Sequence, residues 1–369
     1  MVVEEWKKSG IATKFPTYRN SKLITSQGYF GWRASVRMTK LRAYGVLMMV
    51  FTTLPISFIN TLEVPSGCKK PKIIHLALLI SMFVFAVASV KFNSWLYTIL
   101  AGTTLCWTVI SAHNYFHRRD NWRMYTFNLS MMNFCAWRIS HAMSHHIYPN
   151  SYLDLELSMF EPFLCWVPNL HIKSLMMRYV SWVTEPLVYA IAMYLQIGTR
   201  IVYSLLHTNI MYWHDIISLS IPLSMYLSSD WNLLMCIRQW LLITAIASAA
   251  FCIIGLNAAH HDPRIHHEGD ANREDRDWGL FQVDTIIDRG DLKKSQFLVL
   301  THFGDHALHH LFPTLDHGIL PQLYPVLYQT LDEFKGELRE CNHLEHILGQ
   351  HRQLLRIQPN LLPPGSQKL

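Results

Sequence analysis

Charged residues are scarce in this sequence. Asp, Glu, Lys and Arg make up 16% of the 369 residues and hydrophobic residues make up 50%, whereas an ordinary soluble domain carries about 25% charged residues. Four stretches have no charged residue and approach the roughly 20 residues needed to cross a hydrocarbon core. These stretches are 43–62, 73–90, 92–117 and 239–261. The composition therefore favours a multispanning membrane protein.

Cysteine motifs and an N-terminal signal are also missing. The seven cysteines show no C-x-x-C spacing, which argues against a disulfide framework and against a thiolate zinc site. Residues 1–10 carry charge and no apolar core, so we expect no cleaved secretory signal and a cytosolic N-terminus. The net charge of +6 is spread over polar segments and span ends. This distribution fits the positive-inside rule better than nucleic-acid binding.

The distribution of apolar and polar segments predicts an all-α fold, a multispanning membrane helical bundle with a cytosolic cap that carries the functional site. Residues 1–42 are polar and basic and form a cytosolic N-terminal tail. Residues 43–325 form the membrane domain and its cap. Residues 326–369 form a cytosolic C-terminal helical tail, so both termini are expected in the cytosol.

The number of spans before His117 is open. Basic residues flank the region 43–117 on both sides, and both flanks read as cytosolic. Three crossings would place them on opposite sides. Either only two of the apolar runs cross, or residues 73–112 form one long helix that projects into the cytosol.

The region 186–256 offers three further candidate spans, at 186–206, 210–229 and 231–256, and two of them must cross if the flanking histidines share one side. Between the two membrane regions, residues 152–166 are apolar on one side and predict an interfacial helix.

Histidine is the one residue type in excess, with 21 copies gathered into clusters. On a helix, residues three or four apart share a face, so two such imidazoles can reach one ion. Two clusters add a further adjacent histidine, which suits two metals better than one. The clusters are His113 with His117; His141 with His145 and His146; and His306 with His309 and His310.

Ligand type alone leaves the metal open, because imidazole suits iron, zinc, copper and nickel. Soluble di-iron bundles use Glu and Glu-x-x-His pairs, and no such set stands at matching positions here. A transporter with paired histidines is a rival reading. It predicts ionisable groups inside spans, whereas these clusters lie at span ends.

The order H-x-x-x-H, H-x-x-x-H-H and H-x-x-H-H, the last beyond a second block of apolar runs, resembles the membrane fatty acid desaturase family over residues 44–325. The phrase from His309 to His317 is most similar to front-end desaturases and their insect cytochrome b5-related relatives. Front-end enzymes usually carry Gln at the position of His306. The His-Pro-Gly-Gly haem segment of a fused cytochrome b5 domain is absent from this sequence.

The resemblance implies two iron ions held by the box histidines, with no catalytic residue separate from the metal ligands. In acyl-coenzyme A desaturases an N-x-x-x-H pair after the last span adds a histidine ligand and a water-linked asparagine, and Asn257 and His261 have that spacing. The implied ligands are His113, His117, His141, His145, His146, His261, His306, His309 and His310, with Asn257 as the water-linked contact.

The resemblance further implies an oxygen-dependent enzyme of the endoplasmic reticulum membrane that introduces a double bond into a fatty-acyl chain. Electrons would come from a separate cytochrome b5 and its reductase, unless this form has lost its donor. Two alternatives remain open: a fatty-acyl or lipid hydroxylase on the same site, and a non-catalytic membrane protein that keeps the desaturase scaffold.

Overall fold

The structure is a computed structural model that describes residues 68–118, 122–171, 173–229, 232–256, 259–274, 277–364 and 366. The predicted N-terminal tail at 1–42, the apolar run 43–62 and Asn257 lie outside the described residues.

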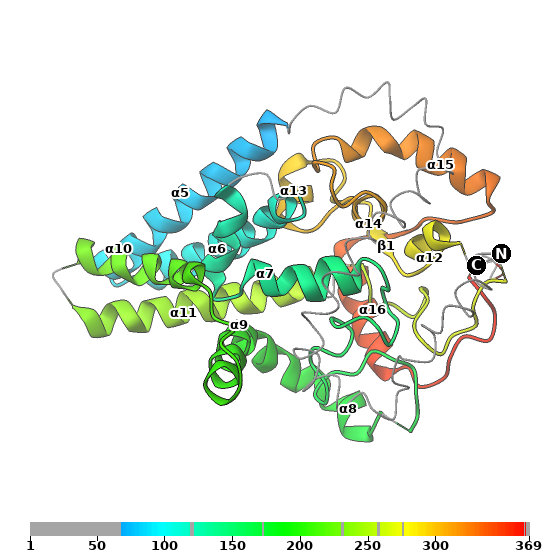
Figure 1. The fold of residues 1–369 in the computed structure, drawn as a ribbon, viewed down its shortest axis with the longest axis horizontal. Coiled ribbons are helices and arrows are strands. Elements are labelled where there is room, and N and C mark those ends of the chain that lie inside the picture. Colours follow the sequence, from blue (N-terminus) through cyan, green and yellow to red (C-terminus); the bar gives the residue numbers. More distant parts are fainter. Residues whose placement is uncertain are drawn as a thin grey trace. The chain divides into compact units, whose positions relative to one another are not determined.

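Three helices of the described part are long and apolar enough to cross a membrane (Figure 1). They are α5 (Lys69–Lys91), α6 (Trp95–Phe116) and α11 (Leu233–Phe251), the last continuing to Gly255. All three pack against one another. Each also exposes large apolar side chains, among them Ile80 on α5, Ile99 on α6 and Leu234 on α11. Such faces fit a hydrocarbon environment.

A tight turn separates α5 from α6. The chain reverses over Phe92–Ser94, where Asn93 has a φ of 45°, a left-handed conformation that asparagine tolerates better than most residues. The two helices then pack along each other as a hairpin. The alternative of one long helix over residues 73–112 is therefore wrong.

The region 186–256 supplies one span among the described residues. Helix α9 (Ser181–Leu206) includes the buried charges Glu185 and Arg200, and the middle candidate breaks into a 3-10 helix, η5 (Trp213–Leu219), and the short α10 (Ser220–Ser228). Of the three candidates, α11 alone is long and apolar enough. Two crossings in this region were expected if the flanking histidines share one side, and the described residues support one.

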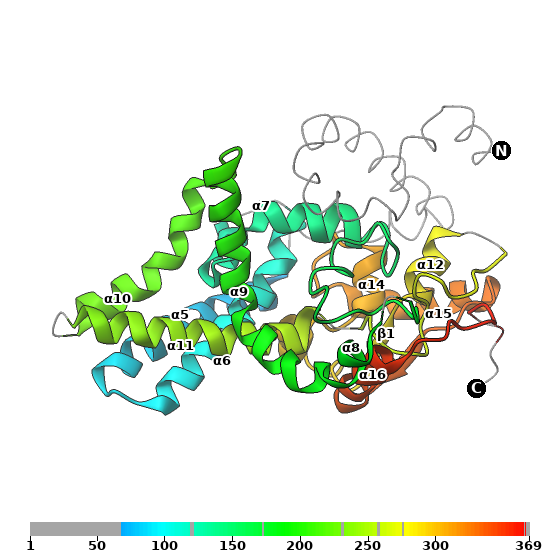
Figure 2. The ribbon, with the colours of Figure 1, turned by 90° about the horizontal axis from the view of Figure 1, so that it is seen from below.

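The remaining elements form the cap, which follows α6 and α11 in the chain (Figure 2). They include a two-stranded parallel sheet in which Ile287 pairs with Arg339 and Arg289 with Cys341. The predicted helical architecture is thus confirmed, with a small sheet added. Helix α11 passes directly into the π-helix η6 (Cys252–Leu256). The cap elements are η3 (Trp122–Ser130), α7 (Phe134–Trp137), η4 (Arg138–His145), α8 (Leu175–Tyr179), α12 (Trp278–Asp284), β1 (Ile287–Arg289), α13 (Gln296–Thr301), α14 (His306–Leu311), η7 (Leu320–Leu323), α15 (Tyr324–Glu333), β2 (Arg339–Cys341) and α16 (His343–Leu355).

The segment 152–166 is a series of turns and not the expected interfacial helix. The Asp154 carboxylate accepts hydrogen bonds from the backbone N–H groups of Asn150 and Glu156. Such side-chain to backbone bonds offer an alternative to helix formation.

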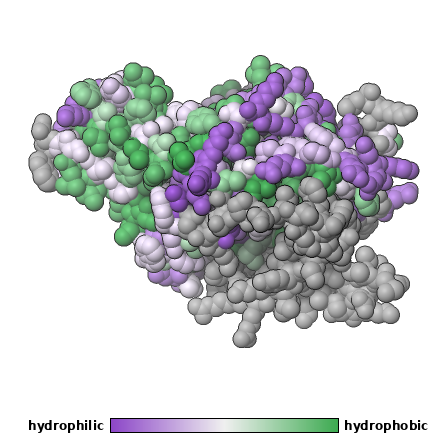
Figure 3. All heavy atoms as spheres, turned by 90° about the horizontal axis from the view of Figure 1, so that it is seen from above, coloured by the Kyte–Doolittle hydropathy of each residue, from purple (hydrophilic) through white to green (hydrophobic). Residues whose placement is uncertain are grey.

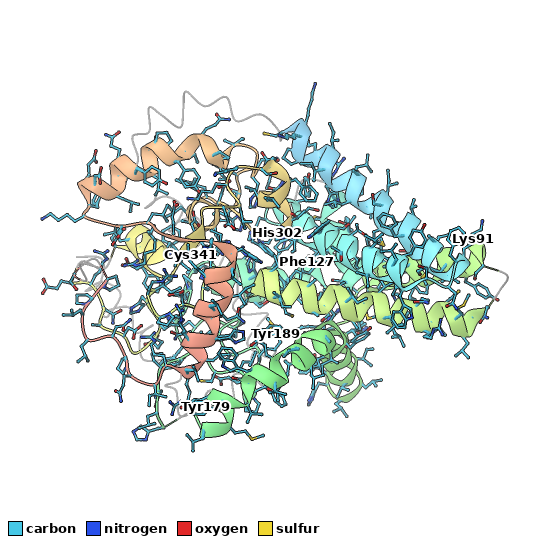
Figure 4. The ribbon with its side chains drawn as sticks, turned by 180° about the vertical axis from the view of Figure 1, so that it is seen from behind. Lys91, Phe127, Tyr179, Tyr189, His302 and Cys341 are labelled. Carbon is cyan, nitrogen blue, oxygen red and sulfur yellow. The ribbon has the colours of Figure 1, made fainter. Side chains whose placement is uncertain are left out.

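Helix α16 is integral to the same compact unit, which covers residues 63–369. Gln353 donates to the carbonyl of Trp166, and the ammonium group of Lys173 donates to the carbonyls of Gln353 and Arg356. Tyr189 on α9 faces α16 (Figure 4), where its hydroxyl accepts from Gln350. The domain boundary at residue 325 stays a prediction.

Side-chain hydropathy separates the two parts of the described chain. In Figure 3 hydrophobic side chains gather over the long helices, whereas hydrophilic side chains gather over the cap.

Candidate metal centre

The first histidine pair lies at the end of α6. His113 belongs to the last turn of the helix and His117 follows directly after it. Their Nε2 atoms are 2.8 Å apart, and the Nε2 of His113 is 2.7 Å from that of His141. The expected i, i+4 geometry therefore brings both imidazoles to one point at the end of a candidate span.

The second group lies on a π-helix, η4, where an α-helix was expected. The backbone N–H of His146 donates to the carbonyl of His141, five residues earlier, at 2.9 Å. This wider turn places His141 and His146 together, with their Nε2 atoms 3.1 Å apart. His145 points instead toward His260, at 3.2 Å between Nε2 atoms. Pairing of His141 with His145 on one ion was expected. These two imidazoles converge with Glu156 in a group that could hold a metal, and the π-turn gives His141 a second partner in His146. Such turns are frequent at functional sites.

The third group lies on α14, which begins beside two buried carboxylates. Asp288 accepts from the backbone N–H of Ala307 at 2.9 Å, and the Tyr324 hydroxyl oxygen lies 3.0 Å from a carboxylate oxygen of Asp288 and 3.0 Å from one of Asp305. Asp305 precedes the helix with a φ of 53°. These contacts fix the start of the short helix and hence the directions of its three histidines.

Together the histidines form two adjoining clusters, each with its ligand nitrogens within 4.8 Å of one another. The imidazoles of His146 and His310 stack across the boundary with ring centroids 4.1 Å apart. Adjacent histidines thus divide between the clusters, as the doubled motifs suggested. Cluster A contains His113, His117, His141, His146 and His309, and cluster B contains His145, His260, His306 and His310.

The donor set fits metal ions. Burial lowers the pKa of His146, His306, His309 and His310 well below the usual value, and neighbouring imidazoles lower it further. These imidazoles are therefore neutral, which is the state that binds a metal. Both ring nitrogens of the buried His309 lack a hydrogen-bond partner, an arrangement that a folded protein rarely tolerates without a ligand. A cation at each cluster would satisfy the converging nitrogens.

Carboxylates contact two of the imidazoles at their Nδ1 atoms. The Nδ1 of His145 is 2.8 Å from Asp154, and the Nδ1 of His141 is 3.0 Å from Glu156. Burial alone lowers the pKa of His145, but Asp154 and Glu156 outweigh it and raise the pKa. A ligand imidazole commonly donates its second N–H to such a group, which fixes its tautomer and direction.

His260 takes the position that sequence reasoning gave to His261. Its Nε2 lies 2.7 Å from that of His306 and 3.1 Å from that of His310, and its Nδ1 lies 3.1 Å from the Thr285 carbonyl. The imidazole of His261 lies outside both clusters and stacks in parallel on Trp166 with centroids 4.0 Å apart. The spacing after α11 could not distinguish the two because Ala259, with a φ of 65°, redirects the chain.

Several supporting residues were missed at the sequence level. The Oε1 of Gln282 accepts from the Nδ1–H of His310 at 2.9 Å. Asp154 and Glu156 lie in the segment 152–166, for which the sequence predicted an interfacial helix. Asp262 and Asp316, which are close in sequence to His261 and His310, instead form ion pairs with Arg264 and Arg118.

An apolar cavity adjoins cluster A. Trp137, in its wall, is also a neighbour of His141, with ring centroids 5.1 Å apart. The cavity lies between the η3–α7 segment, the turns at 159–160, α9 and α11. Its lining residues are Met132, Trp137, Met159, Phe160, Ala192, Met193, Leu195, Gln196, Phe251 and Cys252.

Comparison with known proteins agrees with the site. The model of the fatty acid desaturase family matches residues 92–341. The chain belongs to this family, as its histidine pattern predicted, and the three long apolar helices among the described residues are those of a membrane protein.

Two relatives are both called cytochrome b5-related protein. The one from Drosophila melanogaster is 58% identical over 438 aligned positions that cover 100% of both chains. The one from Drosophila virilis is 80% identical over 25 residues, which are 7% of this chain and 18% of the relative. No solved structure matches the chain.

Proposed function

We propose that this chain is an oxygen-dependent membrane oxidoreductase that introduces a double bond into a fatty-acyl chain at a di-iron site. The observation that carries the proposal is the convergence of nine buried or nearly buried histidines from four chain segments into two adjoining clusters. When bound, two irons would activate dioxygen and remove hydrogen from an unactivated methylene, and the protein supplies position and surroundings.

The ligand set that we propose follows the geometry. His113, His117, His141, His146 and His309 hold one iron, and His145, His260, His306 and His310 hold the other. This set keeps eight of the nine histidines named from the sequence and replaces His261 with His260. Asn257 stays a prediction as a water-linked contact.

An acyl substrate is supported by the apolar cavity next to cluster A. Its lining is almost entirely hydrophobic, with Gln196 as the one amide. Trp137 lines this cavity, and its ring is also a neighbour of the His141 imidazole. An extended hydrocarbon chain in the cavity would therefore run toward cluster A along the face of Trp137.

A separate cytochrome b5 and its reductase are the electron donors that we propose. The alignment with the Drosophila melanogaster relative spans 438 positions, so part of that relative has no counterpart among the 369 residues here. The printed name of both relatives refers to cytochrome b5. The endoplasmic reticulum membrane, where acyl lipids and this donor meet, is the proposed location, with both termini in the cytosol.

The test is product analysis with purified full-length protein. The chain is loaded with iron, supplied with reduced cytochrome b5, its reductase, oxygen and acyl-coenzyme A, and the extracted fatty acids are analysed by mass spectrometry. We expect a product two hydrogens lighter than the substrate. The variant His309→Ala should give none, whereas His207→Ala, an exposed histidine outside the clusters, should keep the activity.

Two other results would each contradict the proposal in a different way. A product heavier by one oxygen atom would assign the hydroxylase activity to the same site. Folded protein that binds no iron under reducing conditions would indicate a non-catalytic desaturase-like scaffold.

A further inference from the structure

A second pocket lies on the cap, away from the metal ligands. It forms where the loop after His261, the strand β2 and the segment that follows α16 meet. Its polar lining includes Arg264, His266, Arg339 and Asn360, and also the carboxylate of Asp270. None of these residues belongs to either histidine cluster.

Two side-chain nitrogens of this pocket are buried without a hydrogen-bond partner. His266 is 7% exposed and its Nδ1 has no partner. The Nη1 of Arg339 is also without one, because the nearest carboxylate oxygen, on Asp284, is 3.6 Å away. Buried polar groups of this kind are rare in folded proteins, and each calls for a ligand, an ion or water.

The surrounding carboxylates are already neutralised by other arginines. Asp284 is bound by Arg273 through two hydrogen bonds, of 2.5 and 3.0 Å. Asp270, the one acid in the pocket wall, is bound by Arg356 through two bonds of 2.8 and 2.9 Å.

The third acid nearby, Asp262, is held by Arg264. Arg339 has only a longer ion pair of 3.6 Å, with Asp284, which Arg273 already binds. The charged residues of the pocket wall are Arg264, Arg339 and Asp270, an excess of one positive charge.

We propose that the pocket formed by Arg264, His266 and Arg339 binds a phosphate group. A guanidinium presents paired N–H donors that match the oxygens of a phosphate. Arg339 forms the inner wall with a side chain 10% exposed, and Arg264 forms the entrance with a side chain 38% exposed. An anion entering past Arg264 would receive hydrogen bonds from Arg339 and His266 at the base of the pocket.

The pocket is connected to cluster B through one side chain. The amide of Asn150 donates to the carbonyl of His266 at 3.0 Å and to the carbonyl of His260 at 2.8 Å. A phosphate held by the loop of His266 therefore fixes the backbone that carries His260. The phosphate could belong to the carrier of an acyl chain, to a lipid headgroup or to free phosphate, and these three sources share the same chemistry.

The test is equilibrium binding to the detergent-purified full-length chain, with inorganic phosphate, coenzyme A and micellar lysophosphatidate as separate probes. We expect saturable binding of at least one probe. Arg339→Gln and Arg264→Gln should each weaken it about 10-fold or more, the typical effect of losing a hydrogen bond to a charged group. Arg352→Gln, at an exposed arginine on α16, removes the same charge and should leave binding unchanged.

The probe that binds most tightly identifies the source of the phosphate. The Arg264→Gln variant is included because the Arg264 side chain is more exposed than that of Arg339, so its substitution disturbs folding less. Gel filtration checks that both variants are monodisperse. The proposal is overturned if monodisperse protein binds none of the probes, or if both variants bind as the unmodified chain does. Binding is read without turnover, so the result is independent of the iron chemistry.

Discussion

His145 and His146 are adjacent in the chain but direct their imidazoles into different clusters. The Nε2 of His145 lies 3.2 Å from that of His260 in cluster B, and the Nε2 of His146 lies 3.1 Å from that of His141 in cluster A. The π-turn of η4 produces this division, because it closes its hydrogen bond between His141 and His146.

Substitution of these two neighbours should therefore affect two different irons. We expect His145→Ala and His146→Ala each to lower the iron content of purified protein from about two per chain, as proposed by analogy with the family. In Mössbauer spectra of protein loaded with ⁵⁷Fe, the two variants should perturb different iron signals. Identical spectral changes in both variants would contradict the assignment of the histidines to separate ions.

His260 and His261 form a second matched pair. His260→Ala should lose iron from cluster B, because its Nε2 lies among those of His145, His306 and His310. His261→Ala should keep its iron and lose thermal stability, since the stack on Trp166 is removed. Stacked aromatic pairs contribute about 1 kcal/mol beyond their buried area. Elemental analysis and thermal unfolding of both variants decide the question, and iron loss confined to His261→Ala would restore the original assignment.

In our assignment Glu156 is not a metal ligand, but we expect it to strengthen metal binding through its contact with the ligand His141. Its carboxylate lies 3.0 Å from the Nδ1 of His141, and loss of such a partner typically costs about 10-fold to 100-fold in metal affinity. Iron titration in the presence of a competing chelator should show this loss for Glu156→Gln. The control is Glu161→Gln, an exposed residue in the same run of turns, for which the affinity should not change.

Ala192 should set how much acyl chain the apolar cavity accepts. Its small side chain lines the cavity from α9, and a leucine there would occupy part of the space. We expect Ala192→Leu to reduce turnover of long-chain acyl-coenzyme A more than that of shorter chains, with iron content unchanged. Comparison of product yields across chain lengths tests this, and an equal loss for all lengths would argue against an acyl chain in this cavity.

Glu185 gives the contact between α9 and α16 a pH dependence. Burial raises its pKa from 4.5 to about 7, while its carboxylate accepts from Gln350 and lies 3.2 Å from the Nδ1 of His351. The folded state thus holds a proton that the unfolded state releases above pH 4.5, so stability should fall as the pH rises from about 4.5 to about 7.

Glu185→Gln should remove this loss, and above pH 7 it should be more stable than the unmodified chain by up to about 3 kcal/mol. Melting temperatures of both proteins at pH 5 and pH 8 measure the effect. Glu333→Gln, at an exposed position on α15, serves as the control. A variant that is equally stabilised at both pH values would exclude titration of Glu185 as the cause.

The sequence by itself determined the family, the apolar helices of the described part and eight of the nine histidines that converge in clusters A and B. Long uncharged runs predicted α5, α6 and α11 because hydrocarbon thickness fixes the length of a span. The pairing of His113 with His117 followed from helical periodicity, which is a local property. The doubled histidines, one for each of two clusters, could be read in the same way.

Only the tertiary structure decided how those histidines are shared. Helical spacing placed His141 with His145, but the hydrogen bond of a π-turn depends on packing around the helix and joined His141 to His146. The choice of His260 over His261 depended on the left-handed backbone at Ala259. The carboxylates that contact the imidazoles lie in a series of turns, in a segment for which the sequence had predicted a helix. Such features arise from contacts between distant segments, and a local pattern of residue types contains no record of them.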